Sequence, residues 1–519
     1  LSPNDDNGYD ISDYREIMRE FGTMEDFDRL LKEIHKREMR LVLDLVVNHT
    51  SDEHPWFEEA RKSRHNPYYN YYHWWPAEKG EPPLRLSYFD EEGNAWTYNK
   101  PTDSYYLHYF SRKQPDLNWE NPEVRQEIFD MMRFWFDKGI DGFRMDSISL
   151  IAKDPSFPLI DSKKYPDIFS FYAKEPRLHL YLHEMNRQVL SKYDCMSVGE
   201  GSAVMVDDVA KFVDPAREEL NMLYHFDAAR IRNTTLPDNP ESGIDYSLIA
   251  LKKMFTEWDK AIDKGWPSIY LGNHDQPRMV SRFGSDKDEF RALSAKMLIT
   301  FLLTMRGTPY WFAGDEIGMR NIRFDRIEDY NDIDTINRYK KAKAEGKDPQ
   351  AVLDEQKETG RDNARTPFQW DRSPEAGFTA GTPWLKVNPD YTWINVADEE
   401  KDPTSILNYF KKVVSFRKEN PSLIYGSYHL LDAENPQSYT FLRKTGADTY
   451  LIMLNFSPKA AISTPGIDMS NAHVLLDNYG DRSHMAPQKD ITLRPFEAIV
   501  FQLNHPVYES FIDSLDLLE

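Results

Sequence analysis

Apolar residues along most of the chain follow two alternating patterns, which predict short strands followed by helices. Residues 40–47 form a nearly continuous apolar run, as buried parallel strands do, and another strand is predicted at 140–145. A capping-box sequence at residues 23–26 opens one helix, and Pro122 and Gly139 bound another in the order typical of helix ends. Further strands are predicted at 195–199, 222–226, 267–271 and 308–312, and further helices at 245–261, 290–305 and 405–417. Strands that alternate with helices indicate a parallel α/β sheet.

Two segments depart from this pattern. Residues 50–115 crowd Trp, Tyr, Pro and His together without helical spacing, which indicates a loop-rich domain inserted after a strand. Residues 320–400 are polar and charged. After Pro421 the chain changes to short alternating runs separated by turn residues, which indicates an antiparallel β-domain. Its strands are predicted at 427–431, 439–443, 449–455, 473–477 and 498–502.

Three carboxyl groups stand at the ends of predicted strands. Asp146 ends the run 142–146, Glu200 follows 195–199, and Asp275 follows 267–271. Side chains on separate strands of a (β/α)8 barrel converge at its C-terminal face, so we expect the three groups to form one site. The chain offers six such strands from residue 40 onward. A closed barrel of this type needs eight.

Composition narrows the possible partners. The formal net charge of −22 argues against nucleic acid and anionic membranes, and the 13% aromatic content suits the flat faces of sugar rings. Cys195 is the only cysteine, so the chain has no intramolecular disulfide, and a cytoplasmic location is expected. No apolar run reaches about 18 residues, which predicts no transmembrane helix. A neutral partner therefore fits this composition better, and the small oligosaccharide expected as substrate follows from the family resemblance given below; the sequence leaves the oligomeric state open.

Four short motifs resemble those of the α-amylase superfamily, glycoside hydrolase family thirteen. They are residues 44–49 (DLVVNH), 142–146 (GFRMD), 198–200 (VGE) and 273–275 (NHD), in the family's order. Three longer stretches resemble its oligo-1,6-glucosidase and α-glucosidase group: residues 105–119, 273–278 and 364–370.

This resemblance implies a domain organisation. Residues 1–49 and 116–420 are expected to form the catalytic barrel, 50–115 the inserted domain, 421–505 a C-terminal β-sandwich, and 506–519 a tail. Relatives carry two further strands and an acidic calcium-type loop before the position of Leu1. The chain is therefore expected to be a truncated form, and no metal or other cofactor is expected.

The resemblance also implies roles for individual residues. Asp146 corresponds to the nucleophile and Glu200 to the acid/base, whose pKa should be raised by burial and by neighbouring acids. Asp275 corresponds to the third carboxylate, which binds sugar hydroxyls. The expected substrate-binding residues are Asp6, Tyr9, His49, Phe110, Gln114, Arg144, His274 and Arg365.

The implied function is a retaining α-glucosidase that releases glucose from the non-reducing end of isomalto- or malto-oligosaccharides. One alternative is a sucrose isomerase or trehalose-forming glucosyltransferase, which shares the same machinery. Another is a non-catalytic, amylase-like transporter subunit. In this group Val after the nucleophile is associated with α-1,6 bonds. Because Ser147 holds that position here, the choice between α-1,6 and α-1,4 bonds stays open.

Overall fold

The computed structural model describes residues 1–519 except 90–92, 162, 166–167, 447, 484–487 and 504–519. The predicted tail at 506–519 therefore lies outside the described residues. The chain divides into two compact units, Leu1–Phe226 with Ala261–Trp266, and Asp227–Lys260 with Pro267–Glu519. Each is described by itself.

The first unit is built on a parallel sheet with strand order β1-β5-β6-β7. Its strands are β1 (Val42–Val46), β5 (Gly142–Asp146), β6 (Met196–Glu200) and β7 (Met222–Tyr224). All four lie where apolar runs predict them. Gly142 pairs with Val42 on one side and with Met196 on the other, which fixes the register across three strands.

Two helices of the first unit lie where their sequence signals predict them. Thr23 and Asp26 form the capping box of α1 (Met24–Lys36). Asn121 caps the start of α3 (Pro122–Lys138), and Gly139 ends it with φ +106, a conformation that glycine adopts without strain. The other helices are α4 (Ile168–Tyr172), α5 (Arg177–Gln188) and α6 (Val209–Val213).

The loop-rich segment 50–115 contains a small antiparallel sheet that the sequence pattern did not predict. Its strands, in the order β2-β4-β3, are β2 (Trp74–Pro76), β3 (Trp96–Asn99) and β4 (Ser104–Leu107), and helix α2 (Pro55–Ala60) precedes them. Each strand is only three or four residues long, too short to display an alternation. Aromatic side chains, among them Trp96, Tyr109 and Tyr172, form its core.

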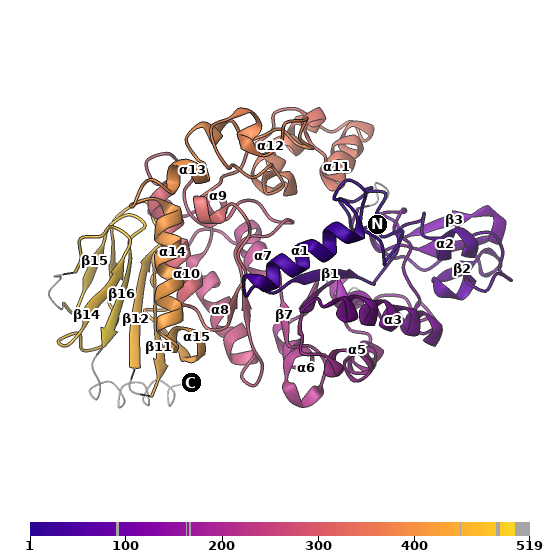
Figure 1. The fold of residues 1–519 in the computed structure, drawn as a ribbon, viewed down its shortest axis with the longest axis horizontal. Coiled ribbons are helices and arrows are strands. Elements are labelled where there is room, and N and C mark those ends of the chain that lie inside the picture. The colour runs from indigo at the N-terminus through magenta and orange to yellow at the C-terminus, as the bar shows by residue number, and fades with distance from the viewer. Residues whose placement is uncertain (90–92, 162, 166–167, 447, 484–487, 504–519) are drawn as a thin grey trace. The chain divides into compact units, whose positions relative to one another are not determined.

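The second unit contains the other two predicted parallel strands, β8 (Ser268–Ile269) and β9 (Thr308–Pro309), which pair with each other. Helix α10 (Arg291–Thr304) is buried on nearly every side, as its long apolar run predicts, and it packs beside α14 (Ile406–Glu419) (Figure 1). The remaining helices are α7 (Asp227–Thr234), α8 (Leu248–Ala261), α9 (Met279–Phe283), α11 (Ile333–Ala344), α12 (Pro349–Thr359), α13 (Val396–Glu399) and α15 (Ser422–Tyr425).

The C-terminal part of the second unit is the predicted antiparallel β-structure. Five strands pair in the order β10-β11-β12-β16-β14. They are β10 (Ser427–Leu431), β11 (Ser438–Thr445), β12 (Asp448–Asn455), β14 (His473–Asp477) and β16 (Ala498–Leu503). A second sheet pairs β13 (Ala461–Ser463) with β15 (Ile491–Leu493), and a buried core that includes Leu451, Met453 and Ile491 joins the two sheets.

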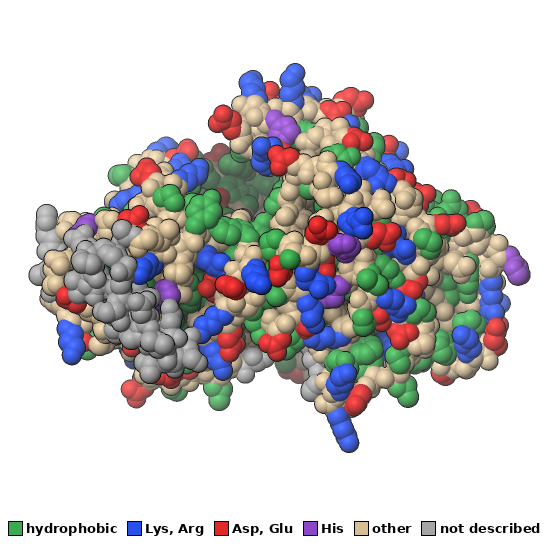
Figure 2. All heavy atoms as spheres, turned by 90° about the horizontal axis from the view of Figure 1, so that it is seen from below, with side chains coloured by type: hydrophobic (Ala, Val, Ile, Leu, Met, Phe, Trp, Pro, Cys, Tyr) green, Lys and Arg blue, Asp and Glu red, His purple; other side chains and the backbone are tan. Residues whose placement is uncertain are grey.

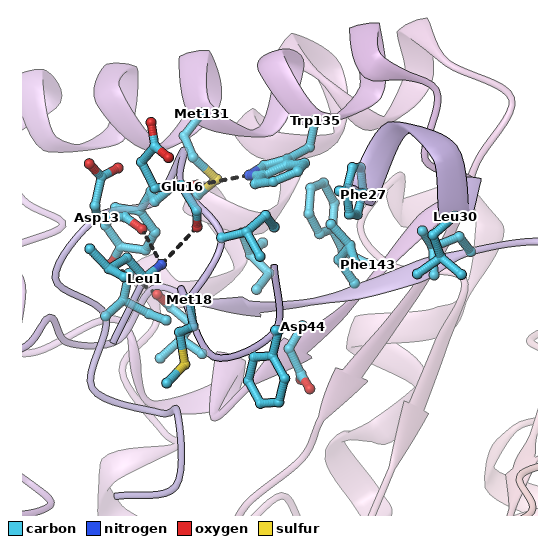
Figure 3. Close-up of a pocket in the computed structure, with 18 of the residues that line it drawn as sticks. Leu1, Asp13, Glu16, Met18, Phe27, Leu30, Asp44, Met131, Trp135 and Phe143 are labelled. Atoms are coloured by element: carbon cyan, nitrogen blue, oxygen red, sulfur yellow. Dashed lines mark hydrogen bonds between the residues drawn. The ribbon is translucent and has the colours of Figure 1, made fainter. Parts of the chain in front are cut away.

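Within the described residues, β1 has a strand neighbour on one side only. Beside it lies a mostly apolar cavity of about 410 Å³, shown in Figure 3. Its lining includes Ile17 from the N-terminal segment, Phe27 from α1, Leu43 from β1 and Trp135 from α3.

The surface carries charges of both signs. Lys and Arg side chains are interspersed with Asp and Glu over the face shown in Figure 2. Among the helices that the structure describes, none is long and apolar enough to cross a bilayer.

The close approach of β5 to β6 explains why glycine opens the GFRMD motif, and it gives a first prediction. A Cβ built on Gly142 would lie 2.2 Å from the carbonyl oxygen of Met196, so Gly142→Ala must push the two strands apart. We expect a loss of roughly 1–3 kcal/mol or more in the free energy of unfolding, measured by denaturant titration. Gly381→Ala is the matched control, because its nearest neighbour would be Thr379 Oγ1 at 3.7 Å. Equal stability of the two variants would contradict the proposed packing.

Candidate functional site

The register of the parallel sheet in the first unit aligns a row of polar side chains across its strands. Asp44 of β1 lies opposite Arg144 of β5, and Glu200 of β6 lies opposite Tyr224 of β7. Met145 pairs with Gly199, so the next residues along, Asp146 and Glu200, are neighbours. Alternate residues of a strand share one face, which places Arg144 and Asp146 on the same side.

The guanidinium of Arg144 bridges three carboxylates. Its Nη1 lies 2.9 Å from Asp146 Oδ1 and 2.8 Å from Asp44 Oδ1, and its Nη2 lies 2.6 Å from Glu200 Oε2. The side chains of Asp146 and Glu200 are 11% and 8% exposed, whereas Asp44 is 47% exposed. The structure therefore brings the first two predicted carboxyl groups together at adjacent strand ends.

The protonation of Asp146 reflects two opposing influences. Burial, and to a smaller extent the charge of Asp44, raise the pKa of this carboxyl, whereas Arg144 and a hydrogen bond with Glu200 lower it, and the resulting pKa is about 6. Because its pKa remains below 7, Asp146 is mostly ionised at neutral pH and becomes protonated as the pH falls through about 6.

Glu200 is held by a further set of donors. The backbone N–H of Ser147 donates to Oε2 at 3.2 Å, and the Ser202 hydroxyl donates to Oε1 at 3.1 Å. Ser147 has φ 42 and ψ 32, a left-handed conformation that is uncommon for residues other than glycine. These donors favour the ionised carboxylate and burial favours the protonated form, so the expected raised pKa of Glu200 stays a prediction.

Two tyrosines fix the position of Arg144. The Tyr9 hydroxyl donates to Asp44 Oδ2 at 3.1 Å, and the Tyr224 hydroxyl accepts a hydrogen bond from Arg144 Nε at 3.0 Å. Both rings lie 5.6 Å from the guanidinium carbon, within the range of a cation–π interaction. Tyr9, one of the expected substrate-binding residues, is thus hydrogen-bonded to a carboxylate that Arg144 also contacts.

The predicted residues His49, Asp6, Gln114 and Phe110 form a second group in the same unit. The Gln114 side-chain amide donates to Asp6 Oδ2 at 3.0 Å and to the Tyr9 carbonyl at 3.3 Å. His49 Nε2 lies 2.9 Å from the same carbonyl, and the Phe110 ring lies 5.1 Å from the His49 ring. His49 is buried, and burial lowers its pKa. His49 and Gln114 therefore meet at the Tyr9 carbonyl, with Phe110 beside His49 and Asp6 beside Gln114.

The second unit contains the other three predicted site residues. Asp275 Oδ1 lies 2.8 Å from Arg365 Nη2, its Oδ2 lies 3.2 Å from His274 Nε2, and Arg365 Nε donates to the His274 carbonyl at 2.8 Å. Arg361 Nη1 also approaches Asp275, at 3.2 Å, and Nη2 of the same side chain lies 2.5 Å from the buried Asp332. The carboxylate of Asp275 is thus held by two arginines.

Four residues of these groups were not predicted as site residues: Asp44, Tyr224, Arg361 and Asp332. Asp44 opens the DLVVNH motif, and strand register gives the signal that connects it with Arg144. Tyr224 lies within the strand predicted at 222–226 and ends the observed strand β7, as Asp146 ends β5 and Glu200 ends β6. Arg361 precedes Arg365 by four residues, a spacing that places two side chains on one side of a helical turn.

The described residues contain one group of acidic side chains with the spacing of a cation site: Asp5, Asp52 and Glu53. The ligand atoms of this group lie within 4.8 Å of one another. The Lys113 ammonium lies 3.1 Å from Asp5 Oδ2, which already supplies a positive charge there.

The sequence and the structure were compared with those of known proteins. Residues 1–426 match the family described as "Alpha amylase, catalytic domain". The oligo-1,6-glucosidase of Parageobacillus thermoglucosidasius is 50% identical over 97% of this chain and 90% of its own length, and that of Bacillus cereus is 47% identical over the same shares. The crystal structure of trehalulose synthase from Pseudomonas mesoacidophila superposes with a TM-score of 0.91 and 41% identity, over 97% of this chain and 90% of that chain.

Proposed function

The chain belongs to the α-amylase family, which confirms the barrel class predicted from its strands, and from this premise we propose that it is a retaining α-glucosidase. Its proposed substrates are short isomalto- or malto-oligosaccharides, from which it releases glucose at the non-reducing end. The names of the relatives support the glucosidase reading, because several at 42–50% identity are oligo-1,6-glucosidases or probable ones.

The observation that carries this proposal is the buried pair of Asp146 and Glu200 on one guanidinium. Cleavage of a glycosidic bond with retention needs a nucleophilic carboxylate and a carboxylic acid about 5 Å apart. Both carboxyl groups lie within hydrogen-bond distance of Arg144, which keeps them on the same side of the sheet.

The proposed roles require Asp146 to be ionised and Glu200 to carry a proton. Asp146 is ionised at neutral pH and attacks the anomeric carbon, while Glu200 gives its proton to the departing glycosidic oxygen. Water, deprotonated by Glu200, then cleaves the glucosyl–Asp146 ester and regenerates both groups.

The other assignments rest on the sequence motifs. We assign Asp275 to the binding of sugar hydroxyls, and Arg361 and Arg365 of the second unit hold its carboxylate. The remaining assigned sugar-binding residues are Asp6, Tyr9, His49, Phe110, Gln114, Arg144, His274 and Arg365. Buried, hydrogen-bonded side chains such as Gln114 and His49 are suited to this task because they are already ordered before a sugar binds.

Removal of the nucleophile gives the first functional prediction. Asp146→Asn should reduce glucose release from isomaltose and from maltose by on the order of 10³-fold or more, because the amide cannot form the covalent intermediate. The ratio of the two rates in the unaltered protein measures the linkage preference that Ser147 leaves open. An unchanged melting temperature would show that the fold is intact, and undiminished activity with an intact fold would refute the assignment.

The pKa of Asp146 predicts the acidic limb of the pH–activity profile. Since the nucleophile must be ionised, kcat/KM should fall as the pH drops through about 6. The charge of Asp44 raises this pKa, so Asp44→Asn should move the limb to lower pH. Asp28→Asn is the matched control, because Asp28 is 53% exposed and also pairs with a cation, Lys138, at 2.8 Å. A limb that stays in place or moves upward in Asp44→Asn would contradict the assignment.

Glucosyl transfer is the second candidate, and the structural similarity to trehalulose synthase favours it. Both reactions share the covalent intermediate and differ in whether water or a second hydroxyl accepts the glucosyl group. Incubation with sucrose separates them. Hydrolysis yields equal amounts of glucose and fructose, whereas transfer yields isomers of sucrose with little free glucose. We expect hydrolysis to dominate, and isomers as the main product would replace our proposal with the second candidate.

A further inference from the structure

We infer that a buried relay of Lys153, Asp116 and Asn48 holds His49 as a neutral imidazole with its proton on Nε2. The three relay residues are thus positioning residues for a histidine that meets the sugar. This inference rests on the proposed function only for the sugar-binding role of His49. The protonation state itself follows from hydrogen-bond geometry within the first unit.

The relay begins with a buried ion pair. Lys153 and Asp116 have side chains that are 1% and 0% exposed, and Lys153 Nζ lies 3.1 Å from Asp116 Oδ2. Lys153 Nζ also donates to Asn48 Oδ1 at 2.5 Å. Charges buried this deeply are tolerated when they are paired and hydrogen-bonded, so both groups hold their neighbours in fixed orientations.

The amide of Asn48 is oriented from two sides. A lysine ammonium has donors and no acceptor, so the amide atom that faces Lys153 must be the oxygen. The other amide atom lies 3.3 Å from Asp116 Oδ1, and a carboxylate only accepts, so this atom must be the nitrogen. The two contacts require the same orientation.

This orientation fixes the proton on His49. Asn48 Nδ2 lies 3.1 Å from His49 Nδ1, and because Nδ2 only donates, Nδ1 must accept. The proton of the neutral ring is then on Nε2, which lies 2.9 Å from the Tyr9 carbonyl, an acceptor. The hydrogen bonds on both sides of the ring therefore agree.

The opposite tautomer is disfavoured by the same contacts. A proton on Nδ1 would face the Asn48 amide N–H, and a lone pair on Nε2 would face the Tyr9 carbonyl oxygen. Its one gain would be the amide of Gln114, whose nitrogen lies 3.3 Å from Nε2. The imidazolium meets the same conflict at Asn48, and burial also opposes it, although the charges of Asp116 and Asp6 favour it.

This tautomer fixes the direction of any hydrogen bond between His49 Nε2 and a sugar. A sugar oxygen that approaches His49 Nε2 must accept a hydrogen bond and share this N–H with the Tyr9 carbonyl, because Nε2 has no lone pair to offer. A hydroxyl oxygen has lone pairs for this and can donate its own proton elsewhere.

The direct test is NMR of the full chain labelled with ¹⁵N-histidine, with the His49 signals identified by their loss in His49→Gln. In the unaltered protein we expect Nδ1 without a proton and Nε2 with one at neutral pH. His54 is an internal reference, because its Nδ1 accepts the backbone N–H of Trp56 and does not depend on Asn48. A protonated His49 Nδ1 in the unaltered protein would overturn the inference.

Asn48→Asp tests the link to the relay. The new carboxylate offers only acceptors to His49 Nδ1, so Nδ1 should become protonated at neutral pH while His54 stays unchanged. The double variant Lys153→Met with Asp116→Asn removes both charges together, so no unpaired charge stays buried. In it the Asn48 amide is free to turn, and part of His49 should move its proton to Nδ1.

Lys174→Met is the matched control, because Lys174 pairs with Asp208 elsewhere in the same unit. It should leave the His49 signals unchanged. If Asn48→Asp leaves Nδ1 unprotonated, the relay does not set the tautomer. These readouts need no substrate, so they separate failure of this inference from failure of the glucosidase proposal, which would appear as absence of glucose release.

Discussion

The guanidinium of Arg144, whose side chain is 15% exposed, holds three carboxyl groups together at the ends of adjacent strands. Arg144 carries a single positive charge among Asp44, Asp146 and Glu200, so the cluster retains an excess of negative charge. Loss of one partner from a buried ionic group typically costs about 3–5 kcal/mol, because the remaining charges lose their compensation. Burial, together with the charge of Asp44, outweighs the attraction of Arg144, and the pKa of Asp146 is therefore raised to about 6 although an arginine contacts it.

Two cations of the first unit, Arg144 and Lys153, hold the polar groups around them in different ways. Arg144 contacts carboxylates directly and tunes an ionisation. Lys153 contacts a carboxylate and an amide, and its effect on His49 passes through the direction of that amide. An ionic contact changes the energy of a charge, whereas an oriented amide selects which ring nitrogen holds a proton. Both depend on burial, because water would screen the first and replace the second.

Much of this arrangement could be predicted from the sequence because it depends on strand period and strand order. A period of two places Arg144 and Asp146 on one face, and the ends of adjacent parallel strands place Asp146 beside Glu200. The helices at α1, α3 and α10 carried their signals in caps and apolar spacing.

Other features could not be predicted because their causes are distant in sequence. The partners of Asp44 and Tyr224 follow from a register that no single segment encodes. Strands β13 and β15 are three residues long, and each is stabilised by its pairing with the other rather than by its own pattern. Helices α11 and α12 lie in a stretch that is polar along most of its length, so the apolar spacing that announces a buried helix is weak there.

Ser147 has a left-handed backbone conformation at the position that is associated with bond preference in the α-glucosidase group. Ser147, which follows the proposed nucleophile, sits at φ 42, where its amide N–H donates to Glu200. A β-branched side chain in this region is strained by roughly 1–2 kcal/mol. Exchange of this serine for valine therefore alters more than the shape presented to a sugar, since any relaxation of the turn would also withdraw a donor from the neighbouring acid. In the proposed mechanism, a substitution of Ser147 that changes the preferred glycosidic bond therefore also changes the hydrogen bonding of Glu200, the proposed acid.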